Sequence, residues 1–275
     1  MTDLDWLPRG TDVDVPSVAR TYDYLLGGAH NLAVDREMGD RMLRVLPGAR
    51  HPVRLNRAFL RRAVTHLVDS GITQFIDLGS GIPTAGNVHE VAPRAKVVHV
   101  DKDPVAVAHA RLIVAGDERV VVVVRADLRD PADVLSRPEV TGLLDLDRPV
   151  ALLMLLVLHF SPDSEDPAGC VARYRDRLAP GSCLVISHAT ADRRVETMRA
   201  AVTTVRRSNS RDNLVYRTRA EVTALFDGFE LEEPGVTGCA LWRPDGAGSV
   251  ADDPDDNAQV HVGLGRKPRD RGPLT

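Results

Sequence analysis

The chain has 275 residues, of which 43% are apolar and 27% are charged, and its net charge is −4. This composition is typical of a globular domain and excludes collagen-like and disordered chains. A net negative charge gives no overall field that attracts nucleic acid, so we expect no nucleic-acid partner. The longest apolar run, residues 150–158, is far shorter than the roughly 20 residues that span a bilayer, so we expect no membrane insertion.

Cysteine use and the N-terminal sequence bear on the compartment. Cys170, Cys183 and Cys239 form an odd set without close spacing, which favours neither a disulfide framework nor a metal site. The first ten residues contain Asp3 and Asp5 and no apolar segment, which is unlike a secretory signal. We therefore expect a cytoplasmic protein with no bound metal.

The first part of the chain predicts helices. A helix is expected from Pro16 to the pair Gly27-Gly28, because proline suits a first turn and glycine ends a helix. Asn31 can cap a second helix that ends before residue 47, and a third helix is expected over residues 52–69. We interpret residues 1–71 as a helical N-terminal cap.

After residue 72 the pattern alternates between strands and helices. Seven strands are expected, at residues 74–78, 96–100, 120–125, 150–156, 182–187, 230–236 and 259–264. The first five are near-continuous apolar runs, as in parallel strands covered on both faces. Asp-Pro pairs at 103, 130 and 166 supply a cap and a first residue for the intervening helices. The sequence thus predicts an α/β, Rossmann-like, mostly parallel sheet over residues 72–265, followed by a flexible tail at 266–275.

Acidic residues at strand ends point to a nucleotide site. Asp77 begins the turn DLGSG after the first strand, where glycines let a ligand approach the backbone. Asp101 ends the second strand, about 20 residues further on, where related folds place an acid for ribose hydroxyls. Asp127 follows the third strand and can accept a bond from an adenine amino group, beside the backbone N–H of Leu128. The alternative is that Asp101 and Asp127 are ordinary loop acids.

Several strings resemble a known superfamily. FIDLGSG, VVHVDKDP, RADL and LAPGSCLVIS are similar to successive motifs of class I S-adenosylmethionine-dependent methyltransferases. PSVARTYDYLLGGAHNLAVDRE, GIPTAGNVHEVAP and VLHFSPD resemble an actinobacterial group of S-adenosyl methyltransferases first catalogued as a domain of unknown function. The resemblance covers residues 16–265 and implies S-adenosylmethionine as cofactor, but it leaves the acceptor open.

The resemblance also implies roles for individual residues. The turn around the methionine part of the cofactor corresponds to Asp77, Gly79, Ser80 and Gly81. The ribose acid corresponds to Asp101, the residue flanking adenine to Lys102, and the adenine-edge pair to Asp127 and Leu128. Pro83 stands where the wider superfamily has glycine, but it agrees with the closer family and makes the turn stiffer. The resemblance implies a further backbone contact to the cofactor at Thr84.

Two further regions can complete the site, one over the cofactor and one beside the acceptor. In the N-terminal segment, Arg20 can hold the cofactor carboxylate bidentately, and Tyr22 or Tyr24 can close the pocket as part of a lid. The alternative is that these residues only pack the first helix. His159 follows the fourth strand and can act as a general base, since its ordinary pKa lies near neutrality. The alternative is a structural hydrogen-bonding role, and His188 is a second candidate.

We expect an enzyme that transfers a methyl group from S-adenosylmethionine to a small-molecule acceptor. One rival is an NAD-dependent oxidoreductase on a related fold, which the DLGSG turn and Asp127 disfavour. Another is a non-catalytic protein that binds S-adenosylmethionine or S-adenosylhomocysteine, because no catalytic base is assured. The oligomeric state is left open.

Overall fold

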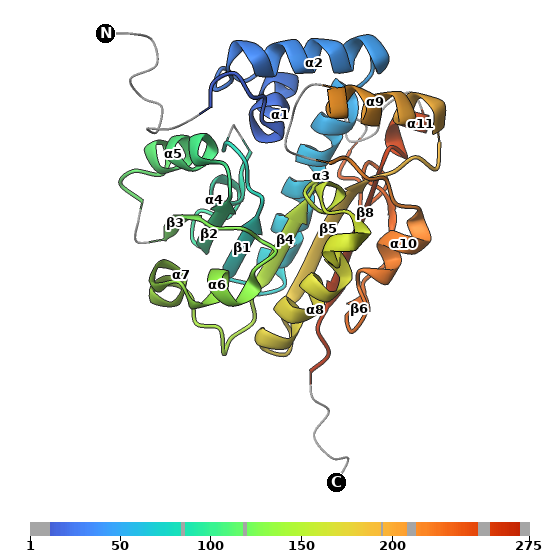
Figure 1. Cartoon of the computed structure of the whole chain (residues 1–275). Helices are drawn as coiled ribbons and strands as arrows, with labels where there is room; N and C mark the ends of the chain where they lie inside the picture. The colour runs from blue at the N-terminus through green and yellow to red at the C-terminus, as the bar shows by residue number, and fades with distance from the viewer. Residues whose placement is uncertain are drawn as a thin grey trace, which may run out of the picture.

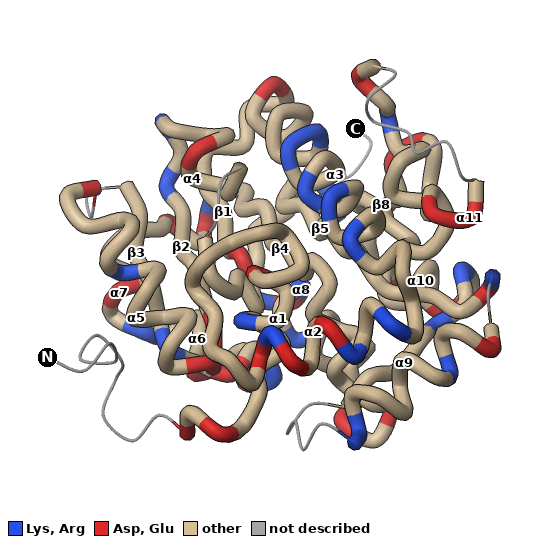
Figure 2. Tube along the Cα trace, turned by 90° about the horizontal axis from the view of Figure 1, so that it is seen from above, with Lys and Arg blue, Asp and Glu red and all other residues tan. Residues whose placement is uncertain are grey.

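The computed structural model describes residues 12–83, 86–117, 120–193, 195–207, 213–246 and 254–269. Figure 1 shows a central sheet between layers of helices, with two N-terminal helices lying across the upper edge of the sheet. The described residues contain no helix with both the length and the hydropathy needed to cross a membrane. Lys and Arg positions are interspersed with Asp and Glu positions along the described part of the chain (Figure 2).

The sheet confirms the predicted α/β, mostly parallel fold. Its strands in the described part of the chain are β1 Gln74–Leu78, β2 Lys96–Asp101, β3 Val121–Arg125, β4 Ala151–Leu155, β5 Cys183–Ala189, β6 Glu230–Leu231, β7 Thr237–Gly238 and β8 Val260–Arg266. Their order is β3-β2-β1-β4-β5-β8-β6, with β7 also pairing with β8. The pairs among β1 to β5 are parallel, and β8 runs antiparallel to β5.

Within the described residues the sheet has eight strands, where the sequence predicted seven. The single strand expected over residues 230–236 is two short strands, β6 and β7, each of two residues. Between them the N–H of Gly235 donates to the carbonyl of Glu232 at 2.8 Å, and Gly235 has a φ of 74°. Pro234 has no N–H to donate to a ladder, so the strand breaks at this turn.

The helices follow the local signals closely. They are α1 Val18–Leu26, α2 Ala33–Val45, α3 Arg50–Asp69, α4 Val88–Val91, α5 Pro104–Ile113, α6 Pro131–Ser136, α7 Pro138–Leu143, α8 Pro167–Arg177, α9 Val195–Arg207, α10 Arg219–Ala224 and α11 Pro254–Asn257, with 3₁₀ turns η1 Leu158–Phe160 and η2 Asp163–Glu165. Asp103, Asp130 and Asp166 each accept a backbone N–H at the start of a helix, which confirms the three predicted caps.

The predicted cap at Asn31 is wrong. The N-cap position of α2 is Leu32, and its backbone N–H donates to the side chain of Asp35 at 2.8 Å. The amide of Asn31 instead donates to Asp23 at 2.8 Å. The buried carboxylate of Asp35 thus takes the capping role that was predicted for Asn31. Asn31 instead fixes the loop between α1 and α2.

Two apolar layers cover the two faces of the sheet, and α3 belongs to one of them. Phe75 and Ile76, neighbours on β1, point into opposite layers. Phe59 and Leu67 of α3 are fully buried in the same layer as Phe75. The region expected as an N-terminal cap thus divides: α3 packs in the core, whereas α1 and α2 lie across the end of the sheet (Figure 1).

The C-terminal end of the sheet extends past the expected boundary at residue 265. Strand β8 includes Arg266, whose Nη2 lies 3.0 Å from Oε1 of Glu232. Nζ of Lys267 donates to the carbonyls of Arg175 and Leu178 at 2.8 and 2.6 Å. The first two residues of the expected flexible tail are therefore held in place, Arg266 by Glu232 and Lys267 by the end of α8. Residues 270–275 lie outside the described residues.

Candidate functional site

A cavity of about 780 Å³ opens at the carboxyl ends of β1 to β4 and is bounded by residues of α1, α2, α3 and α9. In this sheet β2 and β3 lie on one side of β1 and β4 on the other, so the chain order reverses there, and open α/β sheets bind ligands at such a point. The cavity brings together eleven predicted site residues: Arg20, Tyr22, Asp77, Gly79, Ser80, Gly81, Asp101, Lys102, Asp127, Leu128 and His159. Thr84 lies outside the described residues.

The turn after β1 requires glycine. Gly79 and Gly81 have φ values of 69° and 63°, which other residues adopt only at a cost. A Cβ atom on Gly79 would lie 2.3 Å from Cγ2 of Val157, so the loops after β1 and β4 are in close contact. The N–H groups of Gly79 and Ser80 donate to the carbonyl of Val100 at 2.8 and 3.1 Å. The turn is thereby fixed to the end of β2.

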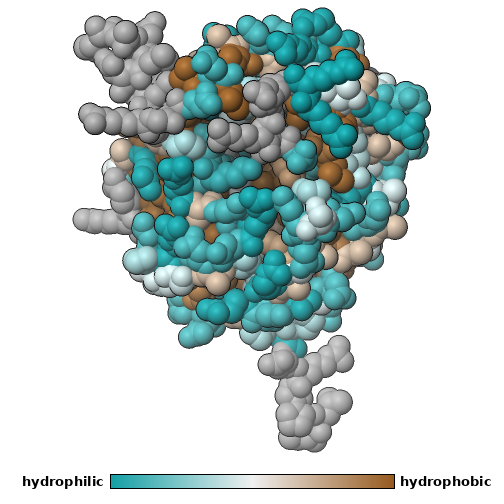
Figure 3. All heavy atoms as spheres, viewed as in Figure 1, coloured by the Kyte–Doolittle hydropathy of each residue, from teal (hydrophilic) through white to brown (hydrophobic). Residues whose placement is uncertain are grey.

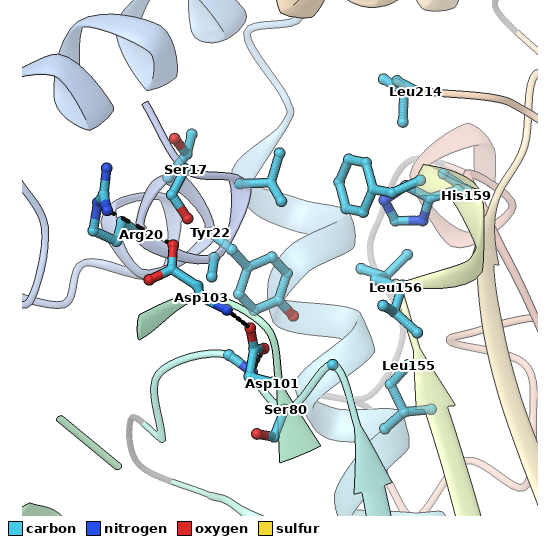
Figure 4. A pocket seen from close by; sticks show the side chains of 18 of the residues that line it. Ser17, Arg20, Tyr22, Ser80, Asp101, Asp103, Leu155, Leu156, His159 and Leu214 are labelled. Atoms are coloured by element: carbon cyan, nitrogen blue, oxygen red, sulfur yellow. Dashed lines mark hydrogen bonds and ion pairs between the residues drawn. The ribbon is translucent and has the colours of Figure 1, made fainter. Parts of the chain in front are cut away.

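Asp101 is a buried carboxylate in the wall of the cavity. Its Oδ2 accepts from the N–H of Gly81 and its Oδ1 from the N–H of Asp103, both at 2.8 Å (Figure 4). Burial raises the pKa of Asp101 to about 6, and the two backbone N–H groups oppose that rise. Each oxygen keeps a second lone pair, so the carboxylate can still accept bonds from a pair of hydroxyls.

The predicted adenine pair has partners of its own. Both carboxylate oxygens of Asp127 accept from Arg129, at distances of 2.5 to 3.0 Å, and Arg129 also lies 2.8 Å from Glu165. The hydrogen bonds from Arg129 hold the pKa of Asp127 below its ordinary value. The carbonyl of Leu128 accepts from the hydroxyl of Tyr174 at 2.9 Å. The contacts to adenine stay predictions.

Arg20 is buried and engaged in an ion pair. Its Nε donates to Oδ2 of Asp35 at 2.6 Å, and its Nη2 donates to the carbonyl of Val15 at 2.7 Å. A third nitrogen, Nη1, lies 3.7 Å from Oδ2 of Asp103, the ion pair drawn in Figure 4. Arg20 thus joins α1, α2 and the start of α5, and its contact to the cofactor carboxylate stays a prediction.

Of the two tyrosines considered for closure, Tyr22 lines the cavity and Tyr24 does not. The hydroxyl of Tyr22 accepts from Nδ2 of Asn56 at 3.1 Å, and burial raises its pKa. The hydroxyl of Tyr24 donates to Asp40 at 2.6 Å, and the guanidinium of Arg50 lies 5.3 Å from its ring. Tyr24 therefore packs α1 onto α2 outside the cavity.

Arg57 is a site residue that the sequence reasoning missed. It lies on α3 in the cavity wall, and its guanidinium carbon is 5.6 Å from the ring centre of Tyr22. Its Nη1 donates to Asn87 at 2.9 Å, but its buried Nε has no partner among the described residues. No sequence signal singled out Arg57. Its helical spacing from Val53 and Leu60, four before and three after, puts it on the face of α3 that lines the cavity.

The unpartnered atoms test whether the wall fits a cofactor with an amino-acid end. Nε of Arg57, Oδ1 of Asn56 and Oγ of Ser80 are buried, line one cavity and lack partners within the described chain. Burying polar atoms without partners costs free energy, which a bound polar group recovers. A cationic donor suits a carboxylate, and amide and hydroxyl oxygens suit an ammonium group. These residues therefore fit the methionine part of S-adenosylmethionine.

His159 lies in η1 at the other side of the cavity and is 6% exposed. Its Nδ1 is buried and has no partner in the described part of the chain. Burial, together with nearby His188 and Arg217, holds the pKa of His159 well below its ordinary value. The imidazole is therefore neutral near pH 7, and one of its ring nitrogens can accept a hydrogen bond.

His188 is not a substrate-side residue, which corrects the second histidine prediction. It is fully buried and does not line the cavity. Its Nε2 accepts from Nη1 of Arg217 at 2.8 Å, and its Nδ1 lies 2.8 Å from the carbonyl of Ala189. Both ring nitrogens are used within the protein, so the role of His188 is structural.

Comparisons with known proteins define the class. A DUF574 family protein from Streptomyces avermitilis MA-4680 is 37% identical, with a TM-score of 0.88 over 94% of this chain and 99% of that one. A candidate methyltransferase from Thermobifida fusca YX is 39% identical, with a TM-score of 0.86 over 96% and 99%. An O-methyltransferase family protein from Burkholderia thailandensis, at 16% identity and a TM-score of 0.51 over 82% and 62%, shares the fold alone.

The family match and the fold together identify an S-adenosylmethionine-dependent methyltransferase with a class I fold. The sequence profile of the S-adenosyl methyltransferase family matches residues 5–268, and the chain belongs to that family. Its cofactor is S-adenosylmethionine, as the sequence motifs predicted. None of the curated proteins compared with the chain matches it.

Proposed function

We propose that the cavity binds S-adenosylmethionine across the ends of β1 to β3 and methylates a small molecule held beyond β4. The observation that carries this proposal is Asp101, a buried carboxylate tied to the glycine turn through Gly81 in the same cavity as Asp127 and His159. An acid at this strand end suits the two hydroxyls of a ribose. The family assignment disfavours the rival hydride-transfer function.

The individual contacts are proposals that follow the wall of the cavity. Asp101 would accept the ribose hydroxyls, Lys102 would flank adenine, and Asp127 with the backbone of Leu128 would meet its edge. Asp77 and the turn at residues 79–81 would surround the methionine part, and Tyr22 would cover it. Thr84 would add a backbone contact.

The cofactor carboxylate has two candidate partners. Arg57 presents a buried Nε without a partner among the described residues, whereas Arg20 already donates to Asp35 at 2.6 Å. Hydrogen bonds between a guanidinium and a carboxylate are charge-assisted and strong. We assign the contact with the cofactor carboxylate to Arg57. Arg20 then orders the two helices, α1 and α2, that cover the cofactor.

Bound S-adenosylmethionine supplies an electrophilic methyl group, so alignment contributes most of the rate. The chain contributes a wall that excludes water and a neutral imidazole at His159 whose Nδ1 faces no other partner in the described residues. We propose that His159 takes up the proton that the acceptor releases.

The three buried, free cysteines suit a reducing compartment, and we propose the cytoplasm.

Calorimetry with the Asp101→Asn variant tests the proposal. Losing the ionised acceptor should weaken binding of S-adenosylmethionine by about 10- to 100-fold, because a hydrogen bond to a charged group contributes about 1.5–3 kcal/mol. The matched control is Asp69→Asn, at an exposed position at the end of α3, which should leave the affinity within twofold. Equal affinities for the wild type and Asp101→Asn would refute ribose binding at Asp101.

A further inference from the structure

The cavity continues beyond the cofactor-binding residues into a compartment between α2 and α9. Figure 4 shows Asp101 and Asp103 at one side of Tyr22 and His159 and Leu214 at the other. The wall on that other side is formed by Met38, Met42, Leu46, Met198, Val205 and Leu214, which we call the α2–α9 compartment. Hydrophobic residues are also visible near α1, α2 and α9 at the top of an otherwise largely hydrophilic face (Figure 3).

The α2–α9 compartment carries no charge of its own. None of the described cavity-lining residues from α2, α9, residues 213–216 or residues 259–260 is charged. A charged acceptor placed there would lose its hydration without gaining a counter-ion, which is strongly unfavourable. Methionine side chains are flexible and make favourable contacts with aromatic rings, so this wall suits a flat apolar ligand.

Three polar atoms interrupt the apolar wall. Nδ1 of His159 and Oε1 of Gln259 are buried without partners in the described residues. The hydroxyl of Tyr216 makes no hydrogen bond within the described chain, and burial raises its pKa. Phe160 adds an aromatic ring 4.1 Å from the ring centre of His159. An apolar pocket with a few unpartnered polar atoms selects a ligand that is mostly apolar and carries one polar group.

We propose that the acceptor is an uncharged aromatic molecule that binds in the α2–α9 compartment and is methylated on a ring hydroxyl. This inference rests on the proposed function and adds the substrate class. The hydroxyl oxygen forms a bond to the methyl carbon as the sulfur–methyl bond breaks and its electron pair returns to sulfur, while the hydroxyl proton passes to Nδ1 of His159. A phenol, with a pKa of about 10, yields its proton to a neutral imidazole more readily than an aliphatic alcohol does.

The ligand class is tested by calorimetry on the full chain saturated with S-adenosylhomocysteine. The probes are 2-naphthol, 2-naphthoate and 2-naphthylmethylammonium, which share a ring system and differ in charge. We expect 2-naphthol to bind at least tenfold more tightly than either charged probe and to gain a labelled methyl group from S-adenosylmethionine. Equal or tighter binding of a charged probe, or no binding of 2-naphthol, would overturn the inference.

The location is tested by filling the compartment. Val205→Trp should weaken 2-naphthol binding at least tenfold, whereas Thr203→Trp, at an exposed position two residues earlier on α9 and outside the cavity wall, should change it less than twofold. If Val205→Trp does not fold, Tyr216→Phe gives the same test with an expected five- to tenfold loss, and its control is Tyr24→Phe. Unchanged binding in Val205→Trp or Tyr216→Phe would contradict the location.

Failure of this inference differs from failure of the proposed function. If S-adenosylhomocysteine binds normally and 2-naphthol does not, the acceptor class is wrong and the cofactor site stands. If S-adenosylhomocysteine itself does not bind to the wild-type chain, the proposed function fails as well.

Discussion

The buried carboxylate of Asp101 makes cofactor binding sensitive to pH. Its pKa is raised to about 6 because burial disfavours the charged form. Because the folded protein favours the protonated form, the contribution of Asp101 to the free energy of unfolding falls as the pH rises from about 4 to about 6. The cofactor hydroxyls bond to the ionised form, so the sign is opposite for binding, and protonation opposes it.

We therefore predict that the dissociation constant of S-adenosylmethionine is constant above pH 7 and rises up to about tenfold per unit below pH 6. Calorimetry between pH 5 and 8 measures this profile. The Asp101→Asn variant removes the titrating group and should show a flatter profile over the same range. A wild-type profile that is flat down to pH 5 would contradict the proposed role of the carboxylate.

The sequence was informative about site residues that follow strands. Asp101 and Asp127 could be predicted because parallel strands bring their carboxyl ends to one edge of the sheet. Arg57 and Tyr216 could not, because one lies on a helix rich in arginine and the other in a loop far along the chain. Their placement depends on how α1 and α3 meet, and on how residues 213–217 pack against η1 through the bond from Val215 N–H to the His159 carbonyl.

The ion pair between Arg20 and Asp35 connects the two helices that cover the cavity. Asp35 is fully buried and also accepts from the N–H groups of Ser17 and Leu32, at 2.9 and 2.8 Å. One carboxylate thus fixes the starts of both α1 and α2. Breaking a buried ion pair leaves an uncompensated charge and costs on the order of 3–5 kcal/mol.

Arginine substitutions separate helix packing from cofactor binding. We predict that Arg20→Ala lowers the free energy of unfolding by about 3 kcal/mol or more, measured by denaturant titration.

Arg57→Ala should instead weaken S-adenosylmethionine binding by about 10- to 100-fold, with Arg61→Ala on the exposed face of α3 as control. Loss of affinity in Arg20→Ala at unchanged stability would return the carboxylate contact to Arg20.

Element prediction succeeded where one local rule was sufficient. Strand β1 was predicted with its observed bounds, and the three Asp-Pro helix starts are confirmed, because apolar runs and capping signals are local in sequence. The break between β6 and β7 was missed because a Pro-Gly pair can end a strand or interrupt it. The cap on α2 was assigned to Asn31 because the competing carboxylate, Asp35, becomes decisive only once Arg20 is brought beside it.

At the scale of the whole molecule, one cavity of about 780 Å³ joins a polar side at the strand ends to an apolar side between α2 and α9. This volume is in the upper part of the range of roughly 300–1,000 Å³ found for small-molecule sites. The sequence predicted the donor side from strand ends. It did not predict the contact between α2 and α9, because all five parallel strands, β1 to β5, lie between these two helices in the sequence.

The most direct test of this account is the electron density of S-adenosylhomocysteine in crystals of the wild-type chain. We predict that the ribose hydroxyls lie within hydrogen-bonding distance of Asp101, with the carboxylate at Arg57 and the sulfur facing the side of His159. Density that places the ribose away from Asp101, or the sulfur facing away from the α2–α9 compartment, would contradict it.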